Sequence, residues 1–424
     1  MMDDDHLQDT QRETVPEKIE TVEDVSSDAQ DFNPRLIATK EQTDILPEDT
    51  SPIQKSDLRR CQLSPDGTSL LLVSASGSKT SSLLETIILP PDLLTESTKQ
   101  LATYSSITLP EQVRTTATYP FFDLSQPSSL LQLVSLPDHP LRLVNSLALD
   151  SGIVATYPYI IPTTEAYLCP HSLLFTPDGT HFFAGVDSQL AIFDVSRQKA
   201  DPVRVSKLRP NGYLGKQYEW RMRRGIVSTM DISQHNLLAI GTFGREIGLV
   251  ESGGWGQCST VIDLKDGAEG SGVSKVKWST CGSYLLVGER QSDAIQVFDV
   301  RGKHELLQTF VGRHAMSMMP LGWDLTPNGE VWAGGMDGHV RIWEGIGKSE
   351  GDVVASASWK AHEDVTIATE VHSSGSVIIT GSAEDRNRKR GNSGHEDDDI
   401  SDNDSQSSQA TDDELDASIK VWSL

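Results

Sequence analysis

The sequence predicts an all-β fold, a ring of seven similar sheets, and two observations lead to this prediction. A short turn phrase recurs along the chain, and each copy is followed by an apolar strand, a polar turn and a second strand. The last four copies start 46, 47 and 47 residues apart, slightly more than the ~40–45 residues of one propeller blade. We find no stretch of helical periodicity long enough to compete with this pattern.

The turn phrase is SPDG or a close variant of it. Proline presets φ at the first corner, Asp or Asn hydrogen-bonds the backbone, and glycine takes the position with φ > 0. The phrase is therefore typical of a tight turn between two antiparallel strands. Its copies are Ser64–Gly67, Thr176–Gly179, Ser279–Gly282, Thr326–Gly329 and Ser373–Ser376, with a degenerate copy at Ser233–Asn236.

The strands around these turns share a second pattern. The strand after each turn ends in small residues, and its copies are Phe182–Gly185, Leu237–Gly244, Tyr284–Gly288, Val331–Gly335 and Val377–Ala383. The next strand closes on an aromatic or acidic residue, as in Leu190–Asp194, Ile247–Glu251, Ile295–Asp299, Val340–Glu344 and Ile419–Trp422. Both strands are rich in Val, Ile and aromatics, as β-strands are. This pattern predicts a WD-repeat β-propeller.

The first two blades are predicted from spacing. Ser64 and Thr176 lie 112 residues apart, which is room for two long repeats. Blade one has candidate strands at Leu70–Ser76 and Glu85–Leu89, and blade two at Tyr119–Leu124, Leu130–Leu136 and Pro140–Val144. With the five later copies the count is seven.

Closure of the ring requires a strand from the N-terminus. The outermost strand of a blade comes from the start of the next repeat, and the chain ends at Leu424, just after the strand that carries Trp422. A ring must close to remove its sheet edges. We therefore expect residues 51–424 to form the propeller and Arg35–Lys40 to be the closing strand.

Most of the negative charge lies in two segments. Residues 1–50 hold 15 acidic and 4 basic side chains, residues 380–416 hold 12 and 4, and the whole chain has a net charge of −25. Residues 1–50 are expected to be an acidic, mostly disordered arm. Residues 384–415 are expected to be a disordered acidic loop inserted in blade seven, because removing them restores the repeat pattern. The ring itself is nearly neutral, so net charge does not exclude RNA binding.

The sequence contains no catalytic or cofactor-binding motif that fits its expected fold. Gly253–Cys258 is glycine-rich, but it opens no helix and is expected to be a connection between strands. Four separated cysteines predict neither a zinc site nor a disulfide framework. The N-terminus lacks a signal-peptide pattern, and no apolar run is long enough to cross a membrane. We expect a non-enzymatic, soluble, intracellular monomer that uses no cofactor or metal.

The histidines are expected to be structural. His362 lies in the phrase Ala361–Asp364, where WD repeats place the histidine of a His–Asp–Trp hydrogen-bond network. His171 and His314 precede strands in related positions and receive the same interpretation.

Two basic segments are candidate functional sites. The stretch between blades three and four has four positive charges interleaved with aromatic residues. The charges could bind phosphates and the aromatic rings could stack on bases. Its candidate RNA-binding residues are Lys216, Tyr218, Trp220, Arg221, Arg223 and Arg224. The alternative is an ordinary solvated loop. The second segment, within the acidic insertion, is a candidate nuclear localisation patch or a chance cluster of charge, formed by Arg386, Arg388, Lys389 and Arg390.

Several stretches go beyond the general repeat pattern. Their order and their residues resemble those of the telomerase Cajal body protein family, a group of nuclear WD-repeat proteins. The resemblance covers roughly residues 56–383 plus the terminal strand. It is most specific at HSLLFTPDG (His171–Gly179) and GTFGREIGL (Gly241–Leu249) and weaker in blade two.

The resemblance implies a nuclear scaffold that binds small nuclear or Cajal-body-type RNA and RNP core proteins, with a role in telomerase RNA or small nuclear RNP assembly and localisation. Fungal relatives resemble pre-mRNA-splicing accessory proteins, which act through protein contacts. A general protein-binding adaptor of the chromatin or ubiquitin-ligase type, using the propeller faces, is a third possibility. The acidic insertion in blade seven departs from the animal pattern.

Overall fold

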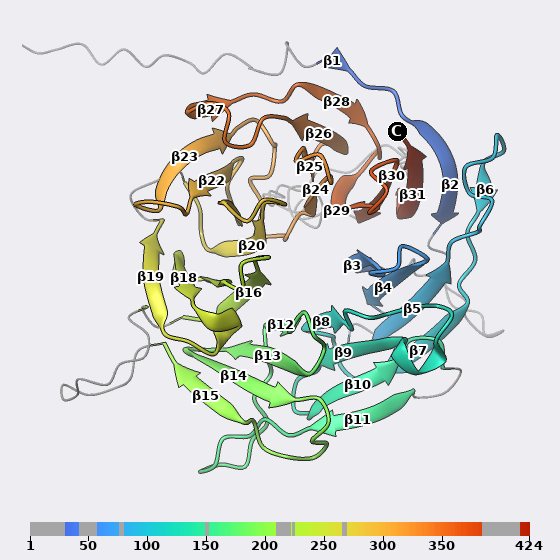
Figure 1. Ribbon diagram of the computed structural model, residues 1–424. Coiled ribbons are helices and arrows are strands. Elements are labelled where there is room, and N and C mark those ends of the chain that lie inside the picture. Colours follow the sequence, from blue (N-terminus) through green and yellow to red (C-terminus); the bar gives the residue numbers. More distant parts are fainter. Residues whose placement is uncertain are drawn as a thin grey trace, which may run out of the picture.

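Figure 1 shows the computed structural model, a closed ring of seven β-sheets around a central axis. The structure describes residues 30–41, 57–75, 80–148, 152–208, 222, 225–264, 269–383 and 416–424. These residues form strands and turns, with two short 3-10 helices at Pro127–Ser129 and Ser252–Gly254. The predicted all-β, seven-bladed WD-repeat propeller is confirmed.

Blades one to four each have four antiparallel strands, named in order from the ring axis outward. Blade one is β3 (Asp57–Leu63), β4 (Ser69–Ala75), β5 (Ser82–Ile88) and β7 (Ser105–Leu109). Blade two is β8 (Thr115–Thr118), β9 (Leu131–Ser135), β10 (Leu141–Asn145) and β11 (Ile153–Tyr157). Blade three is β12 (Ser172–Phe175), β13 (His181–Val186), β14 (Gln189–Asp194) and β15 (Arg204–Lys207). Blade four is β16 (Val227–Ile232), β17 (Leu238–Thr242), β18 (Glu246–Val250) and β19 (Cys258–Asp263).

Blades five to seven each carry a fifth strand that runs parallel to the outermost of the other four. Blade five is β20 (Val273–Trp278), β21 (Tyr284–Glu289), β22 (Ile295–Asp299), β23 (Glu305–Phe310) and β27 (Gly351–Val353). Blade six is β24 (Trp323–Leu325), β25 (Val331–Gly334), β26 (His339–Trp343), β28 (Ala357–Lys360) and β1 (Gln30–Asp31). Blade seven is β29 (Val365–Val371), β30 (Val377–Ala383), β31 (Ser418–Ser423), β2 (Arg35–Glu41) and β6 (Lys99–Gln100).

The recurring turn has the geometry that its residues predict. In its first copy Asp66 Oδ1 accepts a hydrogen bond from Thr68 N at 3.1 Å, and Gly67 has φ +74°. A Cβ on Gly67 would also lie 2.2 Å from His372 Nε2 of the neighbouring blade, so another residue would strain the backbone and displace that imidazole. In the degenerate copy Asn236 takes the same left-handed region, with φ 61°.

The core lies between neighbouring blades, because each sheet is covered on both faces. The middle strands of blade four, β17 and β18, are consequently buried along their whole length. Between blades two and three, Phe182 and Phe193 stack at 5.0 Å, and Tyr157 meets Phe182 edge-on at 5.0 Å. Side chains that a partner can reach therefore lie mainly on the connections at the two ends of the ring and on the outer strands.

The ring closes through the N-terminal strand β2. It pairs antiparallel with β31, from Arg35 opposite Ser423 to Glu41 opposite Ser418, and β31 pairs with β30 on its other side. Ile37 and Ala38 of β2 are buried in the core of blades seven and one. The direct pairing of β30 with β31 means that residues 384–415 connect two adjacent strands.

Blade seven contains a hydrogen-bond network from Trp422 to Asp416. Trp422 Nε1 donates to Thr380 Oγ1 at 2.9 Å, so the Thr380 hydroxyl donates onward to His362 Nε2 at 2.8 Å. His362 Nδ1 then carries the proton that faces Asp416 Oδ2 at 3.3 Å. The predicted structural role of His362 is confirmed, since its side chain is buried within this network.

The predicted strand at Tyr119–Leu124 in blade two is wrong. These residues form a turn, in which Phe122 N donates to Tyr119 O at 3.0 Å, and the inner strand is the less apolar β8. The aromatic content of this segment was misleading because Phe122 is buried in a small cluster with Leu71 and Leu130, outside the sheet. The fifth strands of blades five to seven were not predicted, because two or three paired residues leave no periodic pattern.

We expect deletion of residues 30–42 to lower the melting temperature by about 10 °C or more. The deletion removes β2, exposes the edge of β31 and uncovers apolar side chains worth about 1.5–3 kcal/mol each when buried. Thermal unfolding followed by circular dichroism measures the change. Deletion of residues 1–29 is the control, and equal melting temperatures for the two deletions would contradict a closing role for β2.

We expect His362 to make stability fall as the pH drops. Burial lowers the pKa of His362 below its usual 6.5, although Asp416 opposes this shift. His362 therefore takes up a proton near pH 6.5 in the unfolded chain but only at lower pH in the folded chain. The free energy of unfolding decreases below about pH 6.5 as a result. Melting temperatures measured between about pH 7.5 and about pH 5.5 should fall less in His362→Gln than in the native protein.

The exposed His314 provides the control for this pH series. His314→Gln should leave the pH dependence unchanged. Parallel pH profiles of the native protein and His362→Gln would show that His362 titrates as it does in the unfolded chain, against this interpretation.

Candidate nucleic-acid interface

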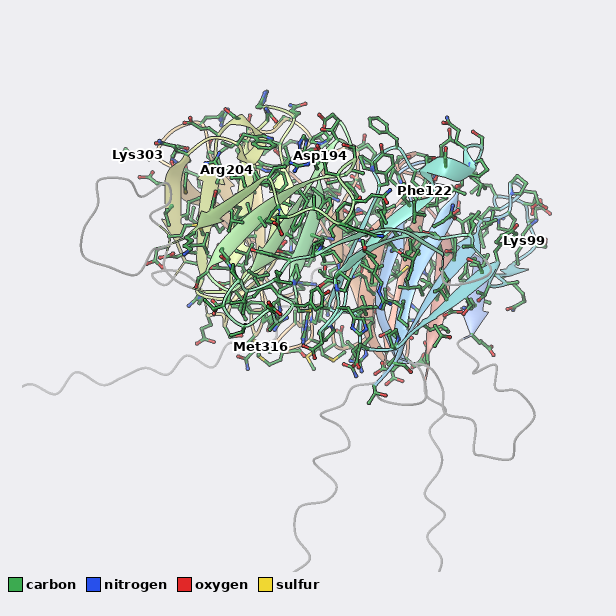
Figure 2. All side chains as sticks on the ribbon, turned by 90° about the horizontal axis from the view of Figure 1, so that it is seen from below. Lys99, Phe122, Asp194, Arg204, Lys303 and Met316 are labelled. Atoms are coloured by element: carbon green, nitrogen blue, oxygen red, sulfur yellow. The ribbon has the colours of Figure 1, made fainter. Side chains whose placement is uncertain are left out.

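The connections between strands leave the ring on two opposite faces. Connections from first to second and from third to fourth strand emerge on one face, those from second to third strand and from blade to blade on the other. In Figure 2, Phe122, Asp194 and Lys303 lie toward the first of these faces, drawn uppermost, and Met316 lies on the second. We call them the upper face and the lower face.

The sequence-predicted site residues fall outside the described residues. This holds for Lys216, Tyr218, Trp220, Arg221, Arg223 and Arg224, and for Arg386, Arg388, Lys389 and Arg390. The described strand ends on either side of these segments, at β15 and β16 and at β30 and β31, all lie at the lower face by the order of the strands.

Met222, within the basic stretch, is a described and fully buried residue. Its side chain belongs to the core between blades three and four, beside Leu208 and Val227. Gly248 makes room for it, because a Cβ there would lie 2.4 Å from Met222 Sδ. The core thus fixes one point of the chain between Arg221 and Arg223.

Gly225 and Ile226, which follow the basic stretch in the sequence, are held by two backbone hydrogen bonds. Gly225 O accepts from Ser188 N at 2.9 Å, and Ile226 O accepts from Phe243 N at 3.0 Å. Phe243 follows β17 on the lower face and is only partly buried. The described chain immediately after Arg224 is therefore hydrogen-bonded to the turn that carries Phe243.

Phe243 is the centre of a cation–aromatic cluster, which we define as Arg114, His171, Phe243 and Arg290. The Arg290 guanidinium carbon lies 4.3 Å from the centre of the Phe243 ring. The His171 ring meets Phe243 edge-on at 6.3 Å, and the exposed Arg114 is near enough to His171 to act on its charge. Four blade ends contribute to this one cluster.

The charges of the cluster are only partly compensated. Burial lowers the pKa of His171, and the charges of Arg114 and Arg290 add to this shift, so the imidazole is neutral at pH 7. Burial also lowers the pKa of Arg290, and its Nε is buried with no hydrogen-bond partner in the described part of the chain. By contrast, the neighbouring Arg245 is neutralised by Glu289, with hydrogen bonds of 2.8 and 2.9 Å. A buried donor without a partner is costly.

Phe243 and Arg290 were missed by sequence reasoning, yet the repeat contains the signal. Both residues stand two positions after the glycine that is the next-to-last residue of the second strand, in GTF (Gly241–Phe243) and GER (Gly288–Arg290). Equivalent positions of adjacent blades lie side by side around a propeller. Aligning the repeats at this position would have placed Phe243 next to Arg290.

The inner strands place mixed charges around the ring axis. Lys277 forms an ion pair with Asp324, and Asp324 Oδ2 also accepts from Val371 N at 2.9 Å. Burial alone would lower the pKa of Lys277, but Asp324 outweighs it and raises the pKa. Burial raises the pKa of Glu370 to about 7, although Lys275 opposes this shift. Lys275, Lys277, Asp324 and Glu370 therefore form a cluster of mixed charges on the inner strands.

The interpretation of His314 as a structural histidine is wrong. Its side chain is exposed and its φ is 58°. The buried residue is Arg313, whose guanidinium donates to Leu321 O at 2.7 Å and Gly322 O at 3.1 Å. His171 contacts the ring of Phe243 and lies in the cation–aromatic cluster.

The described residues contain no group of three or more His, Cys, Asp or Glu side chains arranged to hold a metal ion. Cys61 is buried and Cys281 exposed, and all four cysteines are free thiols. No helix among the described residues has the length and apolar character needed to span a membrane.

Fold and connections define a WD-repeat β-propeller whose lower face carries a cation–aromatic cluster. No protein-family model matches the chain. The chain is 28% identical over 262 residues to guanine nucleotide-binding protein negative regulator 1 of Schizosaccharomyces pombe, covering 61% of this chain and 62% of that protein. It is 23% identical over 420 residues to telomerase Cajal body protein 1 of Mesocricetus auratus, covering 90% of this chain and 73% of that protein.

A third relative is protein SWT21 of Vanderwaltozyma polyspora. It is 22% identical over 298 residues, which cover 66% of this chain and 65% of that protein. The chain thus spans less than two thirds of the length of both fungal relatives. The resemblance to the telomerase Cajal body protein family, with its fungal branch, is confirmed by these relatives.

Proposed function

We propose that this protein is a non-enzymatic nuclear scaffold that binds small nuclear or Cajal-body-type ribonucleoproteins through its lower face. The observation that carries the proposal is the stacking of Arg290 on Phe243, whose turn is hydrogen-bonded to Ile226, two residues after the basic stretch. The buried Nε of Arg290 has no hydrogen-bond partner among the described residues. Unstacked RNA bases bind aromatic rings and guanidinium planes, and phosphates bind Arg and Lys. The printed name of one relative, telomerase Cajal body protein 1, supports the same context.

The role we propose is assembly or localisation of telomerase RNA or of small nuclear RNPs. In this role Lys216, Arg221, Arg223 and Arg224 contact phosphates, while Tyr218 and Trp220 join Phe243 in stacking on bases. His171 remains neutral at pH 7, so it adds a ring without adding charge. RNP core proteins are the expected protein partners.

A second candidate role is that of an adaptor acting through protein contacts, as a pre-mRNA-splicing accessory factor or a general adaptor propeller. The name of the fission yeast relative describes regulation of another protein, which favours contacts with proteins. Crosslinking and sequencing of bound RNA from cells separates the two roles. Recovery of small nuclear or telomerase RNA supports the scaffold, and RNA at background level favours the adaptor.

We expect replacing Arg221, Arg223 and Arg224 with Glu to weaken binding of a single-stranded RNA probe. The slope of log affinity against log salt should also become shallower by about 2, since each phosphate contact contributes about 0.7. Phe243→Ala should lower the affinity about tenfold with little change in slope, because stacking carries no net charge. Fluorescence anisotropy over a salt series measures both quantities.

The matched control reverses three exposed charges on the upper face. Arg197, Lys199 and Lys303 are exposed and follow third strands, and their change to Glu alters net charge equally. If this control variant flattens the salt slope as much as the lower-face variant, binding follows net charge and not the proposed face. Trp255→Ala, an exposed aromatic on the upper face, is the matching control for Phe243→Ala.

We expect residues 384–415 to direct a fused fluorescent reporter to the nucleus. Four basic side chains in a short run are the pattern that nuclear import receptors recognise. Replacing Arg386, Arg388, Lys389 and Arg390 with Ser leaves the acidic residues unchanged and should abolish accumulation. Microscopy of both fusions provides the measurement, and equal distributions would assign the basic run no targeting role.

A further inference from the structure

The upper face contains an aromatic groove that the proposed RNA interface does not use. Its volume is about 670 Å³, and it lies where blades one, two and three meet. This volume falls within the roughly 300–1,000 Å³ of pockets that hold small ligands. Tyr119, Pro120, Phe121 and Val195 supply apolar walls, and Asp66 and Asp123 supply carboxylates. Phe122, labelled in Figure 2, marks the place of the groove on the face.

The groove is built on a rigid turn. Phe122 is 2% exposed and anchors the turn in the cluster with Leu71 and Leu130. Tyr119 packs against the turn of blade three, where a Cβ on Gly179 would lie 2.8 Å from its hydroxyl, and meets Phe175 edge-on at 5.5 Å. Phe121, held edge-on to Tyr119 at 5.9 Å, is nevertheless 55% exposed. An apolar ring on an anchored turn is thus exposed to solvent.

The carboxylates around this ring are ionised at neutral pH. Burial would raise the pKa of Asp66, but hydrogen bonds from Ser64, Leu124 and Thr68 outweigh it and lower the pKa. Hydrogen bonds from the Ser125 side chain and backbone lower the pKa of Asp123. Asp178 and Asp194, which stand beside groove-forming turns, also have lowered pKa values because of hydrogen bonds from Thr176 and Ser196.

Asp123 has acceptor capacity left, whereas Asp66 does not. The two oxygens of Asp66 accept four hydrogen bonds, two each. Asp123 Oδ1 accepts two from Ser125, but Oδ2 accepts, among the residues that the structure describes, only from the exposed Gln126, at 3.2 Å. Asp123 Oδ2 is therefore the atom available to a ligand, and Asp66 contributes its charge.

We infer that this groove binds an extended peptide that contains arginine. A guanidinium can stack on the exposed Phe121 ring and at the same time donate to Asp123 Oδ2. The four carboxylates complement a basic segment, although Arg197 and His181 offset part of the field at Asp194. The same field repels phosphates, so the groove selects a basic peptide against nucleic acid. This site is independent of the proposed RNA interface on the lower face.

Fluorescence anisotropy with the full-length protein and a fluorescein-labelled Ala-Arg repeat of three units tests the inference. We expect saturable binding that weakens with added salt. Phe121→Ala and Asp123→Asn should each weaken it about three- to tenfold, while Phe121→Tyr retains it. Phe121 is exposed and Asp123→Asn keeps the size of the side chain, and unchanged melting temperatures will show that the variants fold.

The controls separate arginine recognition from general attraction. Trp255→Ala changes an exposed aromatic on the same face outside the groove, and it should leave binding unchanged. The matching Ala-Lys peptide should bind more weakly, and the Ala-Glu peptide should not bind. No binding of the Ala-Arg peptide at about 1 mM, equal effects of Trp255→Ala and Phe121→Ala, or equal binding of an Ala-Pro peptide would each overturn the inference.

Discussion

Pairing of β2 with β31 is the contact on which the ring depends. A propeller has no stable open form, because an open ring exposes a sheet edge and one apolar face on each side of the gap. The contact joins the first described strands of the chain to its last strand, so the core of blade seven forms only when both ends have been made. The Trp422–Thr380–His362–Asp416 network lies in the same blade and fixes the strand to which β2 pairs.

Closure of the ring also determines where polar and charged side chains can lie. Because neighbouring blades cover both faces of each sheet, polar and charged side chains gather at the strand ends and along the axis. The two faces of the ring differ in the side chains that they present. Arg290 stacks on Phe243 at the lower face, whereas Asp66 and Asp123 flank Phe121 at the upper face. A scaffold with carboxylates at a groove on one face and a cation–aromatic cluster on the other can hold a basic and an acidic partner at separate sites.

Sequence reasoning succeeded where the repeat constrains each residue and failed where it does not. The left-handed φ of Gly67 favours glycine at this position, so the turn phrase recurs and reveals the blades. Tyr119–Leu124 contains as many aromatics as a strand, but Phe122 is buried beneath a turn, and composition alone does not separate the two cases. The cation–aromatic cluster was not predicted because its members are up to 176 residues apart in the sequence, from Arg114 to Arg290, and come together only in the folded ring.

The net charge of the whole chain does not describe the charge at either face of the ring. The chain carries −25 overall, yet most of this charge lies in residues 1–50 and 380–416, and Arg114 and Arg290 still act on His171 at the lower face. Screening limits the reach of a charge to about 8–10 Å at physiological salt, which is short compared with a ring of seven blades. Recognition by each face is therefore set by the side chains at its own strand ends, and the two faces can evolve separately while β2 and the turns keep the ring intact.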